Sequence, residues 1–568
     1  MRKKWIMKDI ADHRKLNGIS DIVLDVLAAR GVTSDEDIAE FLSPKPQRTY
    51  DPFLLKDMGQ AVDKILEAIR NDTRICIYGD YDTDGVTAIC LMLEFLGNLT
   101  QNMTYYIPSR FEEGYGLNKE AIDLIRNDGV GLIITVDCGS TAIAEVEYAK
   151  GTGMDIIVTD HHNIDGKAAD CLVINAKQQD CRYPFKELCG CGVAFKLAQA
   201  IQRRADIGRQ TLTKLLDLVA IATIGDIVPL IDENRTLVKY GMEIINKGGR
   251  EGIVMLAQAA GLSGQTIRSH QIAYVLVPHL NAAGRMAEAE SGVILLTAKE
   301  NRSMRDAAAT LVSNNNERKR IQEEDFRKCM DIAESKHAND LFMVIDAGRA
   351  HEGIAGIVAG KIKDAFGRPA IVVTGTNGDM QLKGTGRSIE GINIYEVLKK
   401  HGDLFIKFGG HAGACGFLME PANLEILRTG LNRSINEIYE NDSELFVDKL
   451  RIDLPLNPGD IDFELVSQVE RLEPFGHRNE KPVFSLDNVS VDHVMHMGDE
   501  RQHARFTVRD ASGSIDCVLF NEAGEYRAEL EKGSVISVAG YPDINTWNGS
   551  SKIQFVVRDI RWYSNRVD

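Results

Sequence analysis

The sequence predicts an α/β protein: a doubly wound parallel-sheet domain, a long connecting helix, a second and smaller α/β domain, and a C-terminal OB-like β-barrel. Three patterns lead to this prediction. Short apolar runs alternate with helical segments in the first half, a charged stretch without Gly or Pro follows, and the last part alternates apolar and polar residues. A chain of 568 residues is also too long for one hydrophobic core.

The first sheet is predicted from nearly continuous apolar runs that are separated by helical segments such as Ala88–Leu96 and Lys119–Arg126. Strands that are buried on both faces, with helices between them, are typical of a parallel sheet covered on both sides. The predicted strands are Arg74–Tyr78, Leu132–Val136, Asp155–Thr159 and Leu172–Ile174.

The later parts of the chain change in pattern. The polar stretch Asn301–Lys336 favours one long exposed helix, which is either a solvated surface helix or a helix that connects two domains. A second α/β unit is expected from Leu341 to about Tyr439. From about Phe484, three strands, a helix at Glu522–Glu531 and two more strands follow the order of an OB fold. These strands are expected at Val489–Val494, Phe506–Arg509, Ile515–Phe520, Val535–Ala539 and Ile553–Val557.

Composition limits the function classes. The net charge of -17 argues against a protein that coats nucleic acid nonspecifically, because phosphate binding needs a positive field. It does not exclude a nuclease, since carboxylates that hold cations add to the negative total. We expect no secretory signal, because Asp9 and Asp12 precede any apolar run, and no membrane-spanning segment. Cysteines in apolar runs, such as Cys76 and Cys517, indicate a reducing cytoplasm.

Three carboxylates follow the first predicted strand within five residues, namely Asp80, Asp82 and Asp84. They repel one another unless a cation lies among them. An acidic turn that caps the next helix is the simpler alternative. The pattern also resembles the start of an EF-hand loop, but the twelfth position is Leu91 instead of Glu and a strand precedes the run. We therefore exclude an EF-hand.

Further ligands follow the neighbouring strands. Asp137 ends one predicted strand, and Asp160-His161-His162 ends the next. Because parallel strands present their carboxyl ends at one edge of the sheet, we expect these groups to converge there. Asp226, after an apolar helical stretch, adds another carboxylate. Carboxylates with one or two imidazoles suit Mn²⁺ or Mg²⁺, and paired metals are a general device for phosphoryl displacement.

Asp160-His161-His162 is the motif that names the DHH phosphoesterase family, and the chain resembles the RecJ-type single-strand DNA exonucleases of that family over roughly residues 50–565. The Gly409–Gly413 segment resembles the glycine–histidine motif of the associated DHHA1 domain. Other matching segments are Ile107–Arg110, Glu113–Gly116, Asn281–Met286, His351–Ile354, Gly386–Ser388 and Glu473–Gly476.

The resemblance implies six domain segments. They are an N-terminal helical segment (1–70), the DHH catalytic domain (71–300), a connecting helix (301–338), the DHHA1 substrate-binding domain (339–440), a linker (441–483) and the OB domain (484–568).

The resemblance also implies roles for the site residues. Asp137 is expected to bridge two metals, His162 to face the scissile phosphate, and Asp160 to orient a neighbouring imidazole. Many family members carry a His at the position of Tyr78, so Asp80 is the expected substitute ligand. The full expected set of metal ligands is Asp80, Asp82, Asp84, Asp137, His161 and Asp226.

Residues of both the DHH domain and the DHHA1 domain are expected to bind the substrate. Arg110 and Arg285 are candidates for gripping phosphate, since a guanidinium matches phosphate oxygens bidentately. For a single Arg a surface salt bridge is the alternative, and for the Gly409–Gly410 pair a plain turn. The remaining candidates are Asn281, Arg387, Ser388, Gly410 and His411.

The resemblance implies hydrolysis of single-stranded DNA in the 5′ to 3′ direction, with release of 5′-mononucleotides by a two-metal mechanism that uses Mn²⁺ or Mg²⁺. It implies a role in DNA recombination and repair, with a single-strand-binding protein and a helicase as possible partners and a monomer as the default. The OB segment should hold single strands. Candidates for base stacking, or alternatively for barrel core, are Tyr541, Trp547, Phe555 and Trp562.

Two rival functions stay open. One is another DHH phosphoesterase that hydrolyses oligoribonucleotides, cyclic dinucleotides or pyrophosphate, and the other is a noncatalytic replication scaffold on the same fold. ATP use is not expected, because Gly356–Lys361 has the wrong spacing for a P-loop and Ile362 replaces the required Ser or Thr. Zinc is not expected at Cys181, Cys189 and Cys191, which lack paired C-x-x-C spacing.

Overall fold

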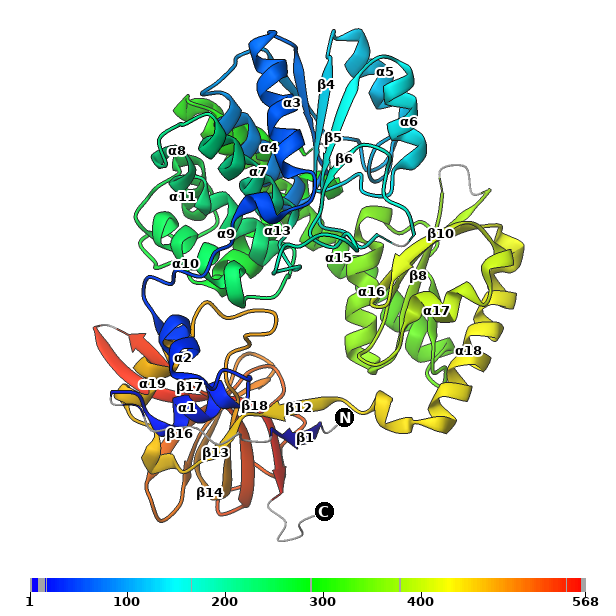
Figure 1. The fold of residues 1–568 in the computed structure, drawn as a ribbon. Coiled ribbons are helices and arrows are strands. Elements are labelled where there is room, and N and C mark those ends of the chain that lie inside the picture. The colour runs from blue at the N-terminus through cyan, green and yellow to red at the C-terminus, as the bar shows by residue number, and fades with distance from the viewer. Residues whose placement is uncertain are drawn as a thin grey trace. The chain divides into compact units, whose positions relative to one another are not determined.

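A computed structural model describes residues 3–8, 16, 18–164, 166–286, 289–376, 380–547 and 549–562. The chain divides into two compact units (Figure 1). The first unit consists of residues 1–46, 443–475 and 480–568, and the second of residues 47–442 and 476–479. The predicted N-terminal segment 1–70 is therefore shared between the units. Within the described residues, no helix is both long and apolar enough to cross a membrane.

The second unit contains the predicted parallel sheet. Its strands are β2 (Ile75–Tyr78), β3 (Met103–Tyr106), β4 (Leu132–Val136), β5 (Asp155–Thr159) and β6 (Leu172–Ile174). They lie in the order β3-β2-β4-β5-β6, and all neighbouring pairs are parallel. β3 is the strand that was not predicted, because its residues are all half-buried and form no continuous apolar run.

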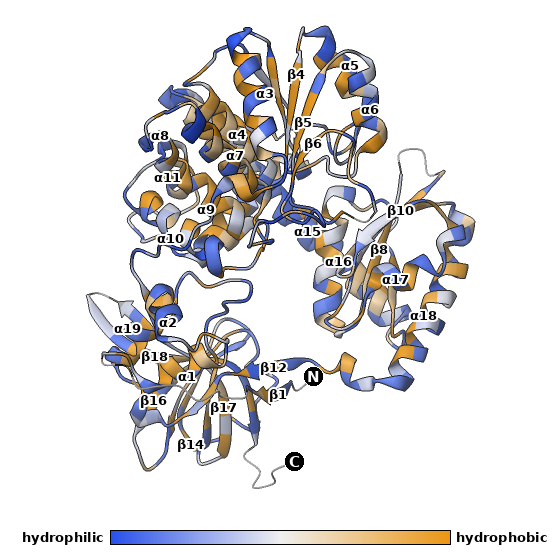
Figure 2. Ribbon diagram, in the orientation of Figure 1, coloured by the Kyte–Doolittle hydropathy of each residue, from blue (hydrophilic) through white to orange (hydrophobic). Residues whose placement is uncertain are grey.

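Two layers of helices cover this sheet. Ile75 and Ile77 of β2 face one layer, whereas Cys76 and Tyr78 face the other. Figure 2 shows apolar colour concentrated on the strands, as expected for a sheet buried on both faces. The first layer contains α3 (Met58–Arg70), α4 (Thr83–Leu96) and α7 (Gly190–Arg204), and the second contains α5 (Lys119–Asn127) and α6 (Ile143–Gly151).

A helical region follows, and the long helix α15 (Asn301–Lys336) comes next with the predicted bounds. α15 packs against α11 (Glu251–Ala259), α13 (Val277–Met286) and α14 (Glu290–Thr297) and, further on, against α16 (Glu352–Phe366) and β7 (Met343–Asp346). It thus joins two sheet regions and is more than a solvated surface helix. The preceding helices are α8 (Gln210–Thr213), α9 (Leu216–Gly225), α10 (Asp232–Asn246), α11 (Glu251–Ala259), α12 (Ser269–Gln271), α13 (Val277–Met286) and α14 (Glu290–Thr297).

The smaller α/β region has a mixed sheet that consists of β7, β8 (Ala370–Gly375), β9 (Leu382–Arg387), β10 (Phe405–His411) and β11 (Ala414–Met419). The order is β10-β11-β9-β8-β7, and the pair β7–β8 is parallel. Ala414 pairs with both Arg387 and His411, so these two candidate residues lie at the same end of neighbouring strands. The sheet's helices are α16, α17 (Ile394–Lys399) and α18 (Leu424–Asn441).

The first unit contains the predicted barrel, with strands β14 (Phe484–Met497), β15 (His503–Arg509), β16 (Ser514–Leu519), β17 (Val535–Trp547) and β18 (Ser550–Trp562). They follow the order β14-β15-β16-β18-β17, and β14 also pairs with β17, which closes the barrel. The strand order of an OB fold is thereby confirmed.

The helix predicted at Glu522–Glu531 is wrong, because the segment forms successive turns. Tertiary contacts fix its path in place of a continuous helical ladder. The Ala523 N–H donates to the carbonyl of Gln502 at 3.1 Å, and the Tyr526 hydroxyl donates to the carboxylate of Asp559.

The first unit also contains parts of the predicted N-terminal helical segment (1–70) and of the predicted linker (441–483), and both include strands. The chain starts with strand β1 (Lys4–Met7), where Trp5 Nε1 donates to the buried Asp559 at 2.5 Å. β1 pairs in parallel with β12 (Lys449–Ile452), which lies in the predicted linker. The other elements of this unit outside the barrel are α1 (Asp21–Ala28), α2 (Asp35–Leu42), β13 (Leu454–Leu456) and α19 (Phe463–Glu470).

Candidate active site

Three strand ends build the candidate site. Asp80 lies two residues after β2, Asp137 directly follows β4, and His161 lies two residues after β5. Because these strands are parallel neighbours, their carboxyl ends share one edge of the sheet. Asp226 joins them from the C-terminal end of α9.

The acidic run before α4 has two kinds of member. Asp82 is the N-cap of α4, and its carboxylate accepts the Gly85 N–H at 3.1 Å, so the capping interpretation holds for this residue. Asp84 lies in the first turn and is 1% exposed, and its carboxylate accepts the N–H groups of Gly190 at 2.6 Å and Cys191 at 2.7 Å.

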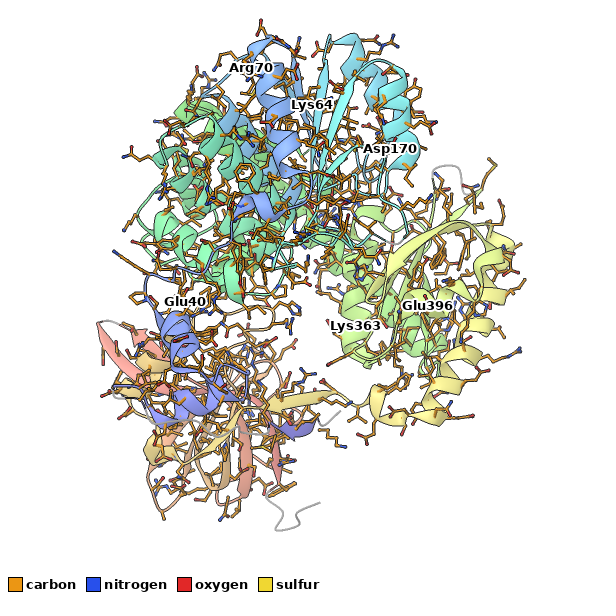
Figure 3. All side chains as sticks on the ribbon, viewed as in Figure 1. Glu40, Lys64, Arg70, Asp170, Lys363 and Glu396 are labelled. Atoms are coloured by element: carbon orange, nitrogen blue, oxygen red, sulfur yellow. The ribbon has the colours of Figure 1, made fainter. Side chains whose placement is uncertain are left out.

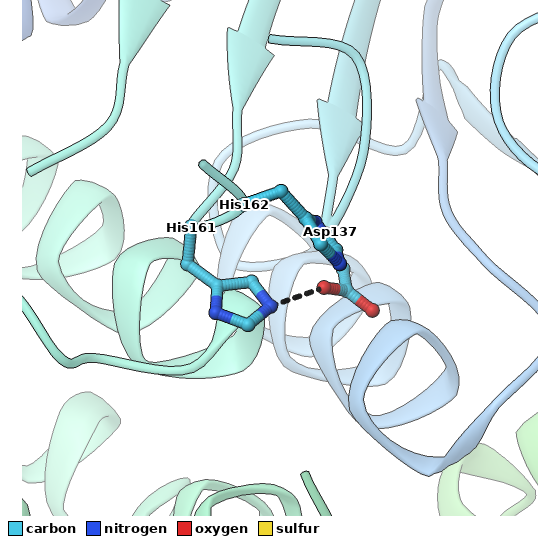
Figure 4. A group of neighbouring side chains, drawn as sticks. All are labelled: Asp137, His161 and His162. Atoms are coloured by element: carbon cyan, nitrogen blue, oxygen red, sulfur yellow. Dashed lines mark ion pairs between the residues drawn. The ribbon is translucent and has the colours of Figure 1, made fainter. Parts of the chain in front are cut away.

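Side chains that could hold a metal gather in three groups, each with its ligand atoms within 4.8 Å of one another, and two of them consist entirely of expected ligands. Asp137 and His161 connect these groups, since His161 Nε2 is 3.1 Å from Asp137 Oδ1 (Figure 4). His161 Nε2 is also 3.6 Å from a carboxylate oxygen of Asp226. The two ligand groups are Asp80, Asp82 and Asp137, and Asp84, His161 and Asp226; the third group combines Asp137 and His161 with His162.

Burial distinguishes these carboxylates from ordinary ones. Charged side chains usually lie on the surface, as Arg70, Asp170 and Glu396 do (Figure 3). Asp80 and Asp137, by contrast, are 3% and 2% exposed. One carboxylate oxygen of each has no hydrogen-bond partner among the described residues.

The electrostatic consequence is a set of carboxyls that resist ionisation. Burial, together with repulsion from Asp82, raises the pKa of Asp84 to about 7. Burial and then Asp84 raise the pKa of Asp226 to about 8. The pKa of Asp137 lies well above its usual range for the same reasons. A cation among these oxygens would reverse the shifts.

His161 has the properties of a neutral ligand. Burial, and then the charge of His162, lower the pKa of His161 to about 3. Its Nε2 faces Asp137 Oδ1 at 3.1 Å, and neither ring nitrogen makes a well-aligned hydrogen bond in the described part of the chain. Buried carboxylates with one neutral imidazole therefore fit Mn²⁺ or Mg²⁺ on their donor chemistry.

His162 and Asp160 form a separate pair. Burial opposes the charged form of His162, but the hydrogen bond between its Nδ1 and Asp160 Oδ1 (2.7 Å) raises its pKa to about 9. Despite its burial, Asp160 has a lowered pKa, chiefly because of the hydrogen bond with His162 and the charge of His162, and further because it accepts the Ser140 N–H at 2.9 Å. The Asp160 carboxylate therefore favours the protonated form of His162.

Tyr78 does not take part in either ligand group. Its hydroxyl donates to the carbonyl of Gly116 at 2.8 Å, and its ring stacks on Tyr106 with centroids 5.5 Å apart. The side chain is fully buried on the sheet face away from α4. Asp80 is the residue that joins the carboxylates in this structure.

Arginines that have no carboxylate partner among the described residues surround the site. The Arg285 guanidinium donates to the Gly353 carbonyl at 3.0 Å, and that of Arg387 donates to the Gly386 carbonyl at 2.8 Å. Burial, and then the charges of Arg110 and Arg387, lower the pKa of Arg285 to about 10. Half-buried cations that repel one another form a natural site for an anion.

The other substrate-binding candidates make hydrogen bonds or close contacts with nearby protein groups. Asn281 Oδ1 accepts both the N–H and the hydroxyl of Thr83 at 2.8 Å, which fixes the start of α4. The Ser388 hydroxyl donates to the Ile392 carbonyl at 2.6 Å. Gly410 has a φ of 147°, and a Cβ there would lie 2.4 Å from the Ala414 carbonyl oxygen. Burial lowers the pKa of His411, and the charges of Arg387 and His162 lower it further. These two side chains are therefore close enough to His411 to act on its charge.

Sequence reasoning did not assign a role to Tyr115 or Arg318. The Tyr115 hydroxyl lies 3.2 Å from His162 Nδ1 and donates to the Asp137 carbonyl at 3.2 Å. Arg318 on α15 donates to Asn315 at 3.0 Å, and its charge contributes to the lowered pKa of Arg285. Tyr115 lies in a motif that could have identified it, whereas Arg318 lies in a helix that looked uniformly exposed.

The barrel residues predicted for base stacking differ in exposure. Phe555 is fully buried and belongs to the barrel core, whereas Trp562 is 44% exposed. Lys481 Nζ lies 4.1 Å from the ring centroid of Tyr541, which is half-buried. The side chain of Trp547 lies outside the described residues. Tyr541 and Trp562 thus remain candidates.

Comparison with known proteins identifies the parts of the chain. The family model described as the DHH family, N-terminal domain, matches residues 74–223, the DHHA1 domain matches 340–437, and the RecJ OB domain matches 452–559. The structure is similar to that of RecJ from Thermus thermophilus in complex with Mn²⁺, with a TM-score of 0.80 and 26% identity over 99% of this chain and 80% of the other.

Curated relatives agree with these matches. The chain is 37% identical to the single-stranded-DNA-specific exonuclease RecJ of Bacillus subtilis, over 95% of this chain and 68% of the relative. It is 31% identical to the protein of that name from Escherichia coli, over 94% of each chain. Together with the carboxylate site at the sheet edge, this similarity shows that the chain belongs to the RecJ family of DHH-domain proteins.

Proposed function

We propose that this chain is a metal-dependent exonuclease specific for single-stranded DNA, which hydrolyses phosphodiester bonds from the 5′ end and releases 5′-mononucleotides. The observation that carries the proposal is the set of buried carboxylates without a cationic partner among the described residues, at the edge where parallel strands end. Relatives of 31% and 37% identity that bear the name of single-strand-specific exonuclease support the choice of substrate.

Two divalent cations would be held by the two ligand groups, with Asp137 bridging them. When bound, such ions activate a water molecule and neutralise charge on the phosphate. The residues of the chain supply the rest of the site: Asp84 is held in place by two backbone N–H groups, and His161 is held neutral by burial. The proposed ligands are Asp80, Asp82, Asp84, Asp137, His161 and Asp226.

His162 is the proposed contact to the scissile phosphate. Asp160 favours its protonated form and fixes its orientation, and its Nε2–H, which lies 3.3 Å from the Tyr115 hydroxyl, would turn to a phosphate oxygen or to the leaving oxygen. Arg110, Arg285 and Arg387 would hold the phosphate from both lobes, since their guanidinium groups have no carboxylate partner among the described residues.

The barrel is proposed to hold the strand beyond the cleaved nucleotide. We place the enzyme in the cytoplasm as a monomer that acts in recombination and repair, with a single-strand-binding protein and a helicase as candidate partners. The rival functions, a small-nucleotide phosphodiesterase and a noncatalytic scaffold, are less well supported. The first does not need the RecJ-type OB domain, and the second does not need a complete carboxylate set.

The test is a hydrolysis assay with labelled single-stranded DNA, duplex DNA and an RNA dinucleotide, each with Mn²⁺, Mg²⁺ or EDTA. We expect cleavage of the single strand alone, 5′-mononucleotide products and no activity in EDTA. Equal cleavage of duplex and single strand, preference for the dinucleotide, or activity that persists in EDTA would refute the proposal.

A further inference from the structure

Gly190, the first residue of α7, contacts two of the proposed metal ligands although it has no side chain. Its N–H donates to Asp84 Oδ2 at 2.6 Å, and the next N–H along the helix, that of Cys191, donates to Asp84 Oδ1 at 2.7 Å. Both oxygens of Asp84 are therefore fixed by backbone groups that a helix leaves unpaired in its first turn.

The same residue packs directly against Asp137. A Cβ at Gly190 would lie 2.5 Å from Asp137 Cβ, 2.6 Å from Oδ1 and 2.7 Å from Cγ, all far below van der Waals contact. Asp137 cannot give way easily, because it is 2% exposed and its backbone has a φ of 62° at the end of β4. Only glycine allows α7 to approach this closely.

We infer that Gly190 is a positioning residue of the metal centre. It lets the start of α7 fix the carboxylate plane of Asp84 while it leaves the space that the side chain of Asp137 needs between the two ligand groups. This inference rests on the proposed function only in that Asp84 and Asp137 hold cations.

The first test is Gly190→Ala, with Gly192→Ala as the matched control two residues further along the helix. A Cβ at Gly192 would meet its nearest neighbour at an ordinary 3.4 Å. Helix propensity alone favours Ala over Gly in both variants. For Gly190→Ala we expect the Kd for Mn²⁺ to rise about 10- to 100-fold, as for loss of a residue that orients a ligand, and kcat to fall with an unchanged KM for single-stranded DNA.

A double-mutant cycle with Asp137→Gly measures the steric contact between position 190 and Asp137 through protein stability, and it needs no nuclease activity. Unfolding by denaturant in EDTA should show that Gly190→Ala destabilises the protein when Asp137 is present and much less in the Asp137→Gly background, where glycine also suits the positive φ. If Gly190→Ala alone fails to fold, the double variant should fold.

Two results would overturn the inference: an equal cost of Ala at position 190 in both backgrounds, or a Gly190→Ala protein that binds Mn²⁺ as tightly as the wild type. Failure of the proposed function has a different signature. A wild-type protein that binds no Mn²⁺ would remove the metal centre but leave the stability cycle between Gly190 and Asp137 intact.

Discussion

The second unit contains two regions with buried carboxylates. In one region the carboxylates are paired with Lys or Arg, and in the other they are not. In the first region, Glu233 is fully buried and accepts hydrogen bonds from Lys196 Nζ at 2.8 Å, the Tyr50 N–H at 3.1 Å and the Tyr183 hydroxyl. Asp217 is likewise buried, and it accepts from Arg250 Nε at 2.9 Å. We call these residues the paired region.

In the second region, the proposed metal centre, the described residues place no Lys or Arg within ion-pair distance of Asp80, Asp84, Asp137 or Asp226. Buried charge is costly unless it is paired, so a fold keeps unpaired carboxylates only where something else compensates them. The chain therefore supplies the counter-charge itself in the paired region, and we propose that cations from solution supply it at the metal centre.

The largest expected effect is on catalysis at the unpaired centre. Asp137→Ala removes the carboxylate between the two ligand groups, so hydrolysis of single-stranded DNA should fall by at least about 10³-fold. Circular dichroism should show an unchanged fold. Asp170→Ala, at an exposed carboxylate, is the control and should retain full activity. An active Asp137→Ala protein would break the contrast between the regions.

The next effect is on stability in the paired region. Lys196→Met leaves Glu233 buried without its cation and should cost about 3 kcal/mol of unfolding free energy, measured by denaturant titration. Mn²⁺ affinity should not change. Lys64→Met, which breaks the half-exposed ion pair with Asp155, should cost less than about 1 kcal/mol. A loss of Mn²⁺ binding in Lys196→Met would mean that the two regions are not independent.

The regions should also differ in their response to pH. Without metal, the folded-state pKa values of Asp84 and Asp226, about 7 and about 8, lie above the value of about 3.9 in an unfolded chain. Their protonation therefore stabilises the folded state below about pH 4, and this stabilisation is lost as the pH rises through 7 and 8. Unfolding in EDTA should show falling stability from pH 5 to 8, and saturating Mn²⁺ should abolish the fall. A flat profile in EDTA would contradict the assignment.

Asp160→Asn tests the role of the hydrogen-bonded pair between Asp160 and His162. The substitution removes the charge that raises the pKa of His162 to about 9, so the alkaline limb of the pH–rate profile should move to lower pH. At pH 8 we expect a loss of about 10- to 100-fold in kcat. An unchanged alkaline limb would exclude His162 as the protonated contact.

The smallest effect is expected at Arg318, whose charge acts on Arg285 and which we propose as a further contact to the DNA phosphates. Arg318→Ala should raise KM for single-stranded DNA by about tenfold with little change in kcat, as for loss of one charge-assisted hydrogen bond. Arg320→Ala, two residues along α15 in an exposed pair with Glu317 and Glu324, should leave KM unchanged. Equal behaviour of the two variants would remove Arg318 from the substrate path.

Features that depend on neighbouring residues could be predicted from the sequence, whereas contacts between residues far apart in the chain could not. Asp137 and His161 follow apolar strands directly, so the edge at which they meet could be predicted from strand order alone. The bond between Gly190 and Asp84 joins residues 106 positions apart, and no local pattern announces it. The predicted helix at Glu522–Glu531 failed for the same reason, because contacts with distant segments override its propensity.

The claim that the unpaired carboxylates form a site for divalent cations can be checked by calorimetric titration of the metal-free protein with Mn²⁺ at pH 8. We predict saturable binding of two ions per wild-type chain, weakened at both positions by Asp137→Ala and unchanged by Lys196→Met. The absence of saturable binding to the wild-type chain, or identical binding to Asp137→Ala, would contradict the claim.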